Sequence, residues 1–312
     1  MSNHGLVMRT EKLSHSSAIW NEIFYCTPNP SPFLSYEWFY ALCHSLLRIE
    51  PEIMVFWDGD RPVGIFPGIV ENKTLRFIGD ERVTDITDII YLSIYEEQFL
   101  ESLASLITSK DWYVDLFPLE TGSPLVRLLP ELLNDVKIKQ ADLSPLLPLP
   151  DSWDSYLSKL DGKERHELRR KLKKASDVAL KSVGSEQIET LFQLMIASSN
   201  EKKDFLKKEV CSFFKAIAES FSKNQWLRFR VSFLDSKPIG AIFSFYFNNR
   251  IYLYNTGFDP DFHSFSPGII SIALDIKSAI DEGFKYYDFL RGEERYKFHL
   301  GAEERYTRRV MR

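Results

Sequence analysis

Two stretches of the chain alternate short apolar runs with turn residues, as antiparallel hairpins do. The apolar runs of the first stretch are residues 53–57, 62–66 and 74–78. Those of the second stretch are residues 226–234, 239–247 and 251–254. Asp, Asn, Gly and Pro separate the runs in both stretches, which are the residues that tight turns require. Each stretch is therefore predicted to form a β-meander.

A helical stretch and then a short strand follow each meander. In the first half they span residues 96–108 and 112–117, and in the second half residues 267–282 and 286–290. Gly283 comes after the second helix, where a left-handed residue is favoured. The order meander, helix, strand occurs twice, which predicts an internal duplication. We expect two α/β (α+β) units, each a mixed, largely antiparallel sheet flanked by helices. Two unrelated α/β domains with similar hairpins are the alternative.

A proline-rich segment separates the two halves. Residues 143–150 contain three prolines, which suits a boundary strand or linker. The length of 312 residues also fits two domains. We predict an N-terminal domain at 1–150 and a C-terminal domain at 151–312, with the working site in the second.

The composition is that of a soluble globular protein, with 44% hydrophobic and 27% charged residues. The net charge of -5 argues against a DNA-binding or general nucleic-acid-binding protein. The three cysteines are scattered and form no CxxC pair, as in a reducing compartment. Residues 1–11 lack the apolar core of a secretory leader, and no run reaches the roughly 20 apolar residues of a membrane span. We expect a cytoplasmic protein, and peripheral contact with the inner membrane face remains open.

The segment Ser266-Pro267-Gly268 has the features of an anion-binding helix start. Ser266 suits the N-cap, and Pro267 suits the first helical position, where an N–H is not needed. Gly268 exposes bare backbone in the first turn, and the first acidic residue afterwards is Asp275. Amide groups and the helix dipole at such a start can hold a phosphate or pyrophosphate. A plain Ser-Pro-Gly helix start is the structural alternative.

A charged loop follows the strand at 286–290, and strand ends in α/β sheets commonly carry ligand sites. Asp288 is either a catalytic carboxylate or a structural one, like Asp115 at the same place in the first half. Lys297 could stabilise an oxyanion or remain a surface charge. His299 is a candidate proton acceptor. Arg291 suits a pocket for a substrate anion, or a salt bridge with its acidic neighbours.

Two further charged segments suit substrate contacts. The basic run at 163–174 predicts anion contacts from Arg165 and Arg169, although such runs are usually solvated helix faces. Asp85 and Asp88 lie in an acidic loop that could line a substrate cleft. Their spacing does not form a metal-ligand set, so no metal site is predicted. The chain has no P-loop, dinucleotide fingerprint, HExxH or GxSxG motif, which argues against the enzyme classes that use them.

An ordered set of motifs resembles one family over most of the chain. In the first half the set is residues 32–38, 58–59 and 84–90, and in the second half residues 153–171, 257–260, 266–268, Gly283, 287–289, 291–292 and 296–297. These motifs resemble bacterial GNAT-type acyltransferases of the CelD/BcsL group, which are related to the FemABX peptidyltransferases. The resemblance implies two tandem GNAT-like domains with an acyl donor bound by the second.

The resemblance also implies roles for individual residues. It places the pantetheine arm of acetyl-CoA or another acyl-CoA beside Tyr254, Asn255 and Thr256, and the pyrophosphate at Ser266, Gly268 and Ile269. It makes Asp288 and Lys297 the catalytic candidates and Arg291 a substrate contact. The pyrophosphate loop typical of GNAT enzymes has several glycines, whereas this chain has Ser-Pro-Gly. An acyl carrier protein or an aminoacyl-tRNA therefore remains open as donor.

The predicted reaction is direct acyl transfer to an amine or hydroxyl of a sugar or cell-envelope precursor. The acceptor attacks the donor carbonyl, backbone amides and Lys297 stabilise the oxyanion, and Asp288 or His299 accepts the proton. The acceptor class comes from the resemblance alone. The alternatives are a FemABX-like transferase that uses aminoacyl-tRNA and a non-catalytic binding protein with the same fold.

Overall fold

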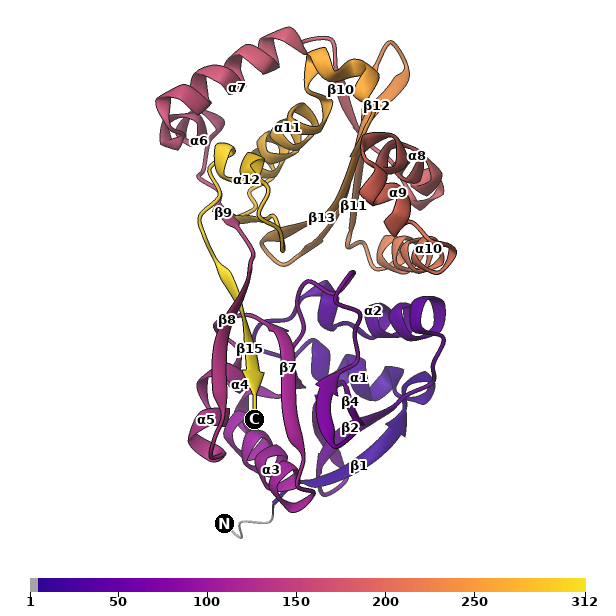
Figure 1. Ribbon diagram of the computed structural model, residues 1–312, viewed down its shortest axis with the longest axis vertical. Coiled ribbons are helices and arrows are strands. Elements are labelled where there is room, and N and C mark those ends of the chain that lie inside the picture. The colour runs from indigo at the N-terminus through magenta and orange to yellow at the C-terminus, as the bar shows by residue number, and fades with distance from the viewer. Residues whose placement is uncertain (1–4) are drawn as a thin grey trace. The chain divides into compact units, whose positions relative to one another are not determined.

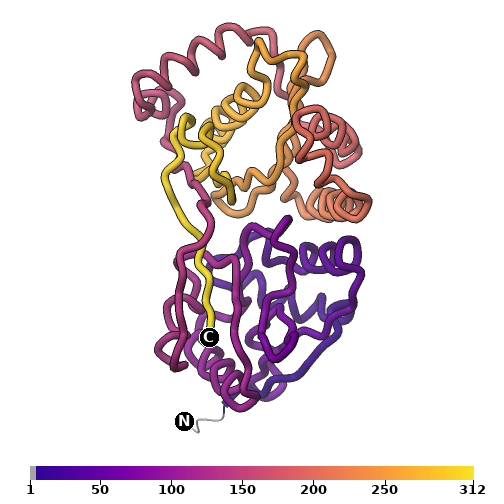
Figure 2. The backbone as a smooth tube through the Cα atoms, viewed as in Figure 1, coloured from indigo at the N-terminus to yellow at the C-terminus, as the bar shows by residue number. Residues whose placement is uncertain are grey.

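The computed structural model describes residues 5–312 and divides the chain into two compact units. The first unit extends to Asp142 and also contains Tyr306–Arg312, whereas the second is Leu143–Arg305. The sequence placed the boundary at residue 150 and the C-terminal residues in the second domain. The chain end differs because its last strand pairs within a sheet of the first unit, where the yellow tube lies among magenta segments (Figure 2). The prediction that residues 1–11 lack the apolar core of a secretory leader includes residues 1–4, which lie outside the described residues.

The first unit contains two sheets, with strand orders β1-β2-β3-β6 and β4-β5-β7-β15-β8. Its strands are β1 (Val7–Lys12), β2 (Glu52–Asp58), β3 (Arg61–Phe66), β4 (Gly68–Glu71), β5 (Thr74–Phe77), β6 (Ile90–Tyr91), β7 (Tyr113–Leu119), β8 (Lys137–Leu143) and β15 (Tyr306–Met311). Its α-helices are α1 (Ser17–Phe24), α2 (Tyr36–Ala41), α3 (Glu96–Ser109), α4 (Pro124–Arg127) and α5 (Leu129–Leu132).

The first meander is divided between these two sheets. β3 pairs with β2 and β6, whereas β4 and β5 pair with each other and β5 continues to β7. Pro67 lies between β3 and β4 and has no N–H to donate to a ladder. Its carbonyl accepts a hydrogen bond from the Ile78 amide at 3.0 Å. The predicted strands are present, and the chain changes sheets at this proline.

The second unit is built on a single sheet with strand order β10-β11-β12-β13-β14-β9. Its strands are β9 (Leu146–Pro148), β10 (Ala179–Ser182), β11 (Leu227–Leu234), β12 (Lys237–Phe247), β13 (Arg250–Phe258) and β14 (Tyr286–Asp288). Its α-helices are α6 (Trp153–Lys159), α7 (Gly162–Lys174), α8 (Ile188–Ser198), α9 (Asn200–Phe205), α10 (Lys208–Lys223), α11 (Pro267–Asp281) and α12 (Arg295–His299). Within this unit, α11 covers one face of the sheet, and α8 and α10 cover the other (Figure 1).

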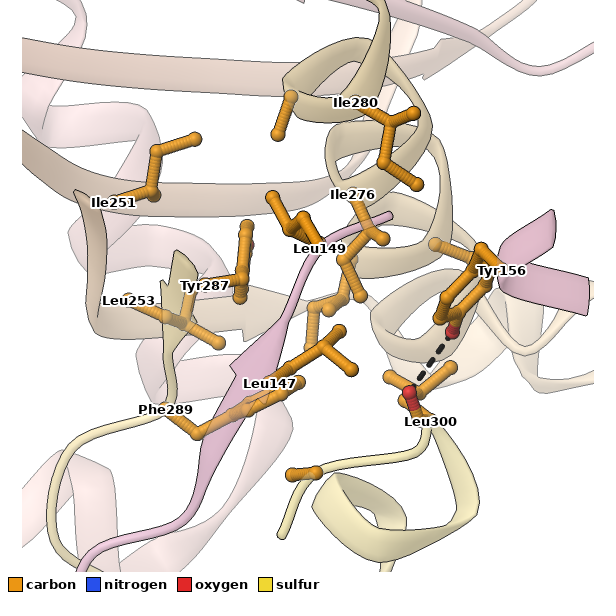
Figure 3. Packing of buried hydrophobic residues seen from close by; sticks show 14 of the residues in the cluster. Leu147, Leu149, Tyr156, Ile251, Leu253, Ile276, Ile280, Tyr287, Phe289 and Leu300 are labelled. Carbon is orange, nitrogen blue, oxygen red and sulfur yellow. Dashed lines mark hydrogen bonds between the residues drawn. The ribbon is translucent and has the colours of Figure 1, made fainter. Parts of the chain in front are cut away.

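One apolar cluster packs at the end of this sheet where the charged loop between β14 and α12 begins. Figure 3 shows side chains from β9, β13, α11 and β14 packed together, with Tyr287 fully buried among them. The Tyr156 hydroxyl of α6 donates to the Leu300 carbonyl at 2.9 Å. Because the cluster joins β14 to α11 and to the residue after α12, it holds the loop between β14 and α12 against a rigid base.

Both units contain the same crossover. In the first, α3 lies in sequence between the parallel strands β5 and β7, and in the second α11 lies between the parallel strands β13 and β14. The strands, the helix and the following strand that the sequence predicted twice are therefore present in both units, but only the second unit has its meander in a single sheet. The fold is mixed α/β, with largely antiparallel sheets flanked by helices, as predicted.

Candidate functional site

An open strand edge lies between β13 and β14 in the second unit. Their parallel ladder ends at Tyr252 and Asp288, but β13 continues to Phe258. On its other side β13 pairs with β12, with an irregularity where Tyr254 is an extra residue. Such a bulge re-aims the strand beyond it. The part of β13 after Tyr252 is thus the place where an extended ligand could pair with backbone groups.

The three residues predicted beside the donor arm have different environments. The ring of Tyr254 is 8% exposed and packs on Phe214 and Phe245, with centroids 5.4 and 5.1 Å away. Its side chain belongs to the core, so only its backbone can serve a ligand. Asn255 and Thr256 are half-buried at the open part of the strand.

The start of α11 has the geometry of an anion site. Ser266 is the N-cap with left-handed backbone (φ 52°, ψ 54°), and Pro267 occupies the first turn. Within the part of the chain that the structure describes, Ser266 makes no side-chain capping bond, and the first turn contains no acidic residue. The first amides of a helix lack intrahelical acceptors. The amides of Gly268 and Ile269 are thus not capped by the Ser266 side chain.

A lysine from the basic helix is directed at this helix start. The Lys171 ammonium of α7 donates to the Ser266 hydroxyl at 2.8 Å and lies 3.3 Å from Glu167. A cation at the positive end of a helix is electrostatically unfavourable unless an anion lies between them. The residues of this helix that were predicted from the sequence to contact an anion are Arg165 and Arg169. In the structure Arg165 donates to the Ser158 carbonyl at 3.4 Å, and Arg169 is exposed. The signal for Lys171 was its position three residues after the buried Leu168, on the inner face of α7.

A small cavity of ≈150 Å³ lies beside this helix start. Its lining comes from α7, α11, α12 and the residue after α12: Glu164, Glu167, Leu168, Lys171, Ile269, Tyr296, His299 and Leu300. The His299 side chain is 56% exposed, and its Nδ1 lies 3.9 Å from the Glu164 carboxylate. Burial raises the pKa of the Tyr296 phenol, which keeps this group protonated. The fold therefore brings His299, Ile269 and Lys171 to one cavity.

Asp288 is fully buried and its carboxylate is occupied. Both oxygens accept from Arg305 Nη2, at 2.9 and 2.7 Å, and one also accepts from the Leu290 amide at 2.9 Å. Arg250 lies 3.5 Å away on the neighbouring strand. These contacts fit the structural alternative that the sequence left open for Asp288.

Lys297 is also buried and holds the loop after β14. Its ammonium donates to the carbonyls of Leu290, Arg291 and Gly292 at 3.3, 3.0 and 3.3 Å, and it lies 2.9 Å from Glu294. An ammonium has three N–H groups, so these acceptors take its full donor capacity. Arg291 enters this contact through its backbone. The arrangement shapes the loop and leaves little capacity for an oxyanion.

Sequence reasoning missed Lys202, a cation on α9 at the open edge of β13. Its ammonium donates to the Thr256 carbonyl at 2.5 Å and lies 3.4 Å from the Thr256 hydroxyl. Desolvation lowers the pKa of Lys202, against the opposing effects of Glu294 and Glu201. Its two hydrogen-bonding partners are neutral, which is costly for a mostly buried cation. No sequence pattern marks this residue, because it lies in an ordinary charged run, Asn200–Phe205.

Asp85 and Asp88 belong to the first unit. The Asp88 carboxylate accepts from the Ser123 hydroxyl at 2.9 Å and from the Ile89 amide at 2.8 Å. Burial raises the pKa of Asp88 to about 7, against the lowering effect of those hydrogen bonds. Asp85 is half-buried on the same segment. Their role in substrate binding stays a prediction.

Residues 5–312 contain neither a cluster of potential metal ligands nor a helix that could span a membrane. No group of three or more His, Cys, Asp or Glu side chains in these residues is arranged to hold a metal ion. No helix among them combines the length and apolarity that crossing a membrane requires.

Comparisons with known proteins agree with the fold. Residues 162–298 match the family model described as the acetyltransferase (GNAT) domain. No curated protein sequence matches significantly. Among solved structures, FemX is similar with a TM-score of 0.67 at 11% identity, covering 96% of both chains.

Two further structures are similar over nearly the whole chain. One is the C-terminal domain of a putative lysylphosphatidylglycerol synthetase from Agrobacterium fabrum, with a TM-score of 0.59, 8% identity and coverage of 96% and 92% of the two chains. The other is a GNAT-family acetyltransferase from Colwellia psychrerythraea, with a TM-score of 0.54, 11% identity and 98% coverage of both chains. The chain thus has a GNAT-type, FemX-related fold, and residues 162–298 are similar to the acetyltransferase (GNAT) domain model.

Proposed function

We propose that this protein is an acyltransferase that takes an acyl group, most simply acetyl, from acyl-CoA and transfers it to an amine or hydroxyl of a sugar or cell-envelope precursor. One observation carries the donor assignment: among the described residues, Ser266 makes no capping bond to α11, the first turn of α11 has no acidic residue, and Lys171 donates to the Ser266 hydroxyl. A diphosphate there would accept from the Gly268 and Ile269 amides and from Lys171, in competition with Glu167.

The rest of the donor would extend along the open edge of β13. From α11 the chain leads back to Thr256 and Asn255, whose backbone groups can pair with the amides of a pantetheine arm. This route uses the backbone of Tyr254 and not its ring, which lies in the core. It would end near the extra residue in the β12–β13 ladder, where the strand changes direction.

The chemistry follows from direct attack of the acceptor on the thioester carbon. A new C–N or C–O bond forms, the carbonyl electrons move to oxygen, and collapse breaks the C–S bond and expels the thiolate. The acceptor's proton passes to water, because His299 lines the cavity beside the proposed diphosphate position and not the end of the pantetheine arm. Lys202 stabilises the oxyanion, because at most two of its three N–H groups are directed at Thr256. Asp288 and Lys297 hold the strand end and the loop in place.

The decisive experiment measures donor binding by thermal shift with CoA, acetyl-CoA and nucleotide sugars. A ligand that binds only the folded state raises the melting temperature by mass action. We expect CoA and acetyl-CoA to stabilise the wild type and Lys171→Gln to remove most of that shift. Arg169→Gln is the matched control, because it removes one positive charge from the exposed face of the same helix. A flat panel with the wild type would refute the donor assignment.

A second candidate is aminoacyl transfer from aminoacyl-tRNA. Two observations favour it: the FemX-like fold, and a helix α7 with seven basic and two acidic residues in an otherwise acidic protein. Phosphate contacts from α7 would release counterions, so tRNA binding would weaken steeply with salt. Salt-sensitive tRNA binding together with no response to CoA would replace the first proposal by this one.

A further inference from the structure

A cavity of ≈410 Å³ opens in the first unit where β5 and β7 diverge. The ladder between these strands ends at Leu75 and Val114, and the next residue of each strand, Arg76 and Asp115, lines the cavity. Arg309 joins them from the C-terminal strand β15. The volume is in the range of small-molecule sites.

These three charged residues form a compact group. Arg309 donates two hydrogen bonds to Asp115, at 2.6 and 2.8 Å, and Arg76 Nη2 lies 3.6 Å from the same carboxylate. Hydrogen bonds from Arg309 lower the pKa of Asp115, so this carboxylate stays ionised. Two guanidinium groups therefore share one carboxylate, and the group carries one net positive charge.

The second unit contains the same group in a closed form. Asp288 is paired with Arg305 and lies 3.5 Å from Arg250, which is on the strand that corresponds to β5. There the carboxylate is 0% exposed and the two arginines are 21% and 25% exposed. In the first unit the corresponding exposed fractions are 18% for Asp115, 35% for Arg309 and 50% for Arg76. The duplicated charge group is thus structural in one unit and open to a cavity in the other.

Arg76 keeps most of its hydrogen-bonding capacity. At 3.6 Å its guanidinium is close enough to Asp115 for charge attraction but too far for a hydrogen bond. Arg309 uses Nε and Nη2 on Asp115, and its Nη1 lies 3.9 Å from Glu81 on the rim. Planar guanidinium groups with unspent N–H donors match the geometry of carboxylate and phosphate oxygens.

The rest of the lining limits what can enter. Glu71, Asp80 and Glu81 also line the cavity, and of these Asp80 is held by Arg82. With Asp115 the lining has four carboxylates and two guanidinium groups, so polyanions are repelled and a ligand with one anionic group has to contact Arg76 and Arg309 directly. Phe77 and Phe117 supply apolar walls.

The wall of the cavity also contains a buried, unpaired hydroxyl. Thr87 is 1% exposed and lines the cavity, and its hydroxyl has no hydrogen-bond partner among the described residues. Buried polar groups without partners are rare and costly. We propose that this cavity binds a small molecule through a single carboxylate or phosphate group, which Arg76 and Arg309 hold. The site is distinct from the donor site of the second unit, and its occupation does not depend on acyl transfer.

The test is NMR of arginine Nε–Hε groups in the full chain, titrated with inorganic phosphate and separately with acetate at constant ionic strength. Arg76→Gln and Arg309→Gln assign the two signals. We expect saturable shifts of both signals with at least one anion, and an at least fivefold higher half-saturation concentration for the Arg309 signal in Arg76→Gln. Saturation by phosphate alone identifies a phosphate-bearing ligand, and by acetate alone a carboxylate.

The controls separate this site from general charge effects and from the donor site. Lys139→Gln removes an exposed positive charge from the same unit outside the cavity and leaves the titration unchanged. Arg165 and Arg169 report on α7 in the same spectra, so phosphate binding near α11 is seen separately. Unsaturable shifts, or half-saturation that is the same in Arg76→Gln and wild type, would overturn the proposal. Since Arg76 is half exposed, its loss leaves the fold intact, which the melting temperature verifies.

Discussion

The crossover helices of the two units begin in opposite electrostatic settings. The first turn of α3 contains Glu96 and Glu97, and Glu96 is paired with Arg127 at 2.9 Å. The first turn of α11 contains no acidic residue among those described, and Lys171 approaches its N-cap. Carboxylates satisfy the positive end of α3, whereas α11 is left to attract an anion from outside.

The charged groups around Asp115 and Asp288, on the strands that follow α3 and α11, show the opposite difference between the two units. The group around Asp288 is closed and that around Asp115 opens to a cavity. The comparison teaches that two units with the same order of helix and strand can differ in which charged groups are satisfied by their own side chains. In the first unit the protein's own side chains satisfy the start of α3, and the charged group around Asp115 is open. In the second unit they satisfy the charged group around Asp288, and the start of α11 is open.

The largest expected effect separates the closed charge group from the open one. Asp288→Ala leaves Arg305 and Arg250 without their carboxylate in a buried place, which costs about 3–5 kcal/mol of unfolding free energy. Asp115→Ala, at a more exposed site, costs about 1 kcal/mol. Urea unfolding of both variants measures the difference. Equal losses would contradict the distinction between a structural and an open group.

A carboxylate placed at the start of α11 makes it resemble α3. Gly268→Asp puts a negative charge in the first turn, so we expect CoA binding to weaken by about 10- to 100-fold. Calorimetry or the CoA-induced thermal shift measures it. Gly268→Ala is the steric control, because its Cβ would lie 3.1 Å from the Phe258 ring without adding charge. If both variants bind CoA equally, charge at this helix start does not govern donor binding.

The acidic segment of the first unit has its own pH signature. The pKa of Asp88 is raised to about 7, so between the unfolded value near 4 and pH 7 the folded state binds more protons. Stability contributed by this group is therefore lost as the pH rises through that window. We expect Asp88→Asn to stabilise the protein by about 1–2 kcal/mol at pH 8 and to have little effect at pH 4. Unfolding curves at the two pH values test this, and a gain that is larger at pH 4 would reverse the sign.

The smallest effect concerns the open edge of β13. Desolvation lowers the pKa of Lys202, so its ammonium loses the proton more readily than at its ordinary value. The exposed Lys203 on the same helix is the internal reference. We expect CoA to slow acetylation of Lys202 by acetic anhydride by about threefold while leaving Lys203 unchanged, since a pantetheine arm would shield the Thr256 edge. Mass spectrometry quantifies both sites. CoA that binds without protecting Lys202 would exclude this strand edge as the donor route.

Much of the fold was predictable because it rests on local patterns. The alternation of apolar runs and turn residues identified the strands of both meanders, and the helix predicted at 267–282 is observed as Pro267–Asp281. The pairing of the last strand was not predictable. β15 lies between β7 and β8 of the first unit, and nothing in its residues specifies which sheet edge it joins.

The site was predictable to the extent that it depends on sequence neighbours. Ser266, Pro267 and Gly268 mark a helix start in any fold, whereas the role of His299 as a proton acceptor stays a prediction. Lys171 and Lys202 come from helices distant in sequence, and their long side chains reach the site only after those helices pack. Asp288 and Lys297 illustrate the converse, because their types suggested chemistry while their partners in space hold them in place.

By itself the sequence determined the two α/β units, their repeated order of elements and the charge-free first turn of α11, because these follow from residues within one or two turns of each other. Only the tertiary structure decided which charges are satisfied. Electrostatic pairing depends on distance in space, and the same Asp–Arg group is closed around Asp288 and open around Asp115 because different segments pack beside it.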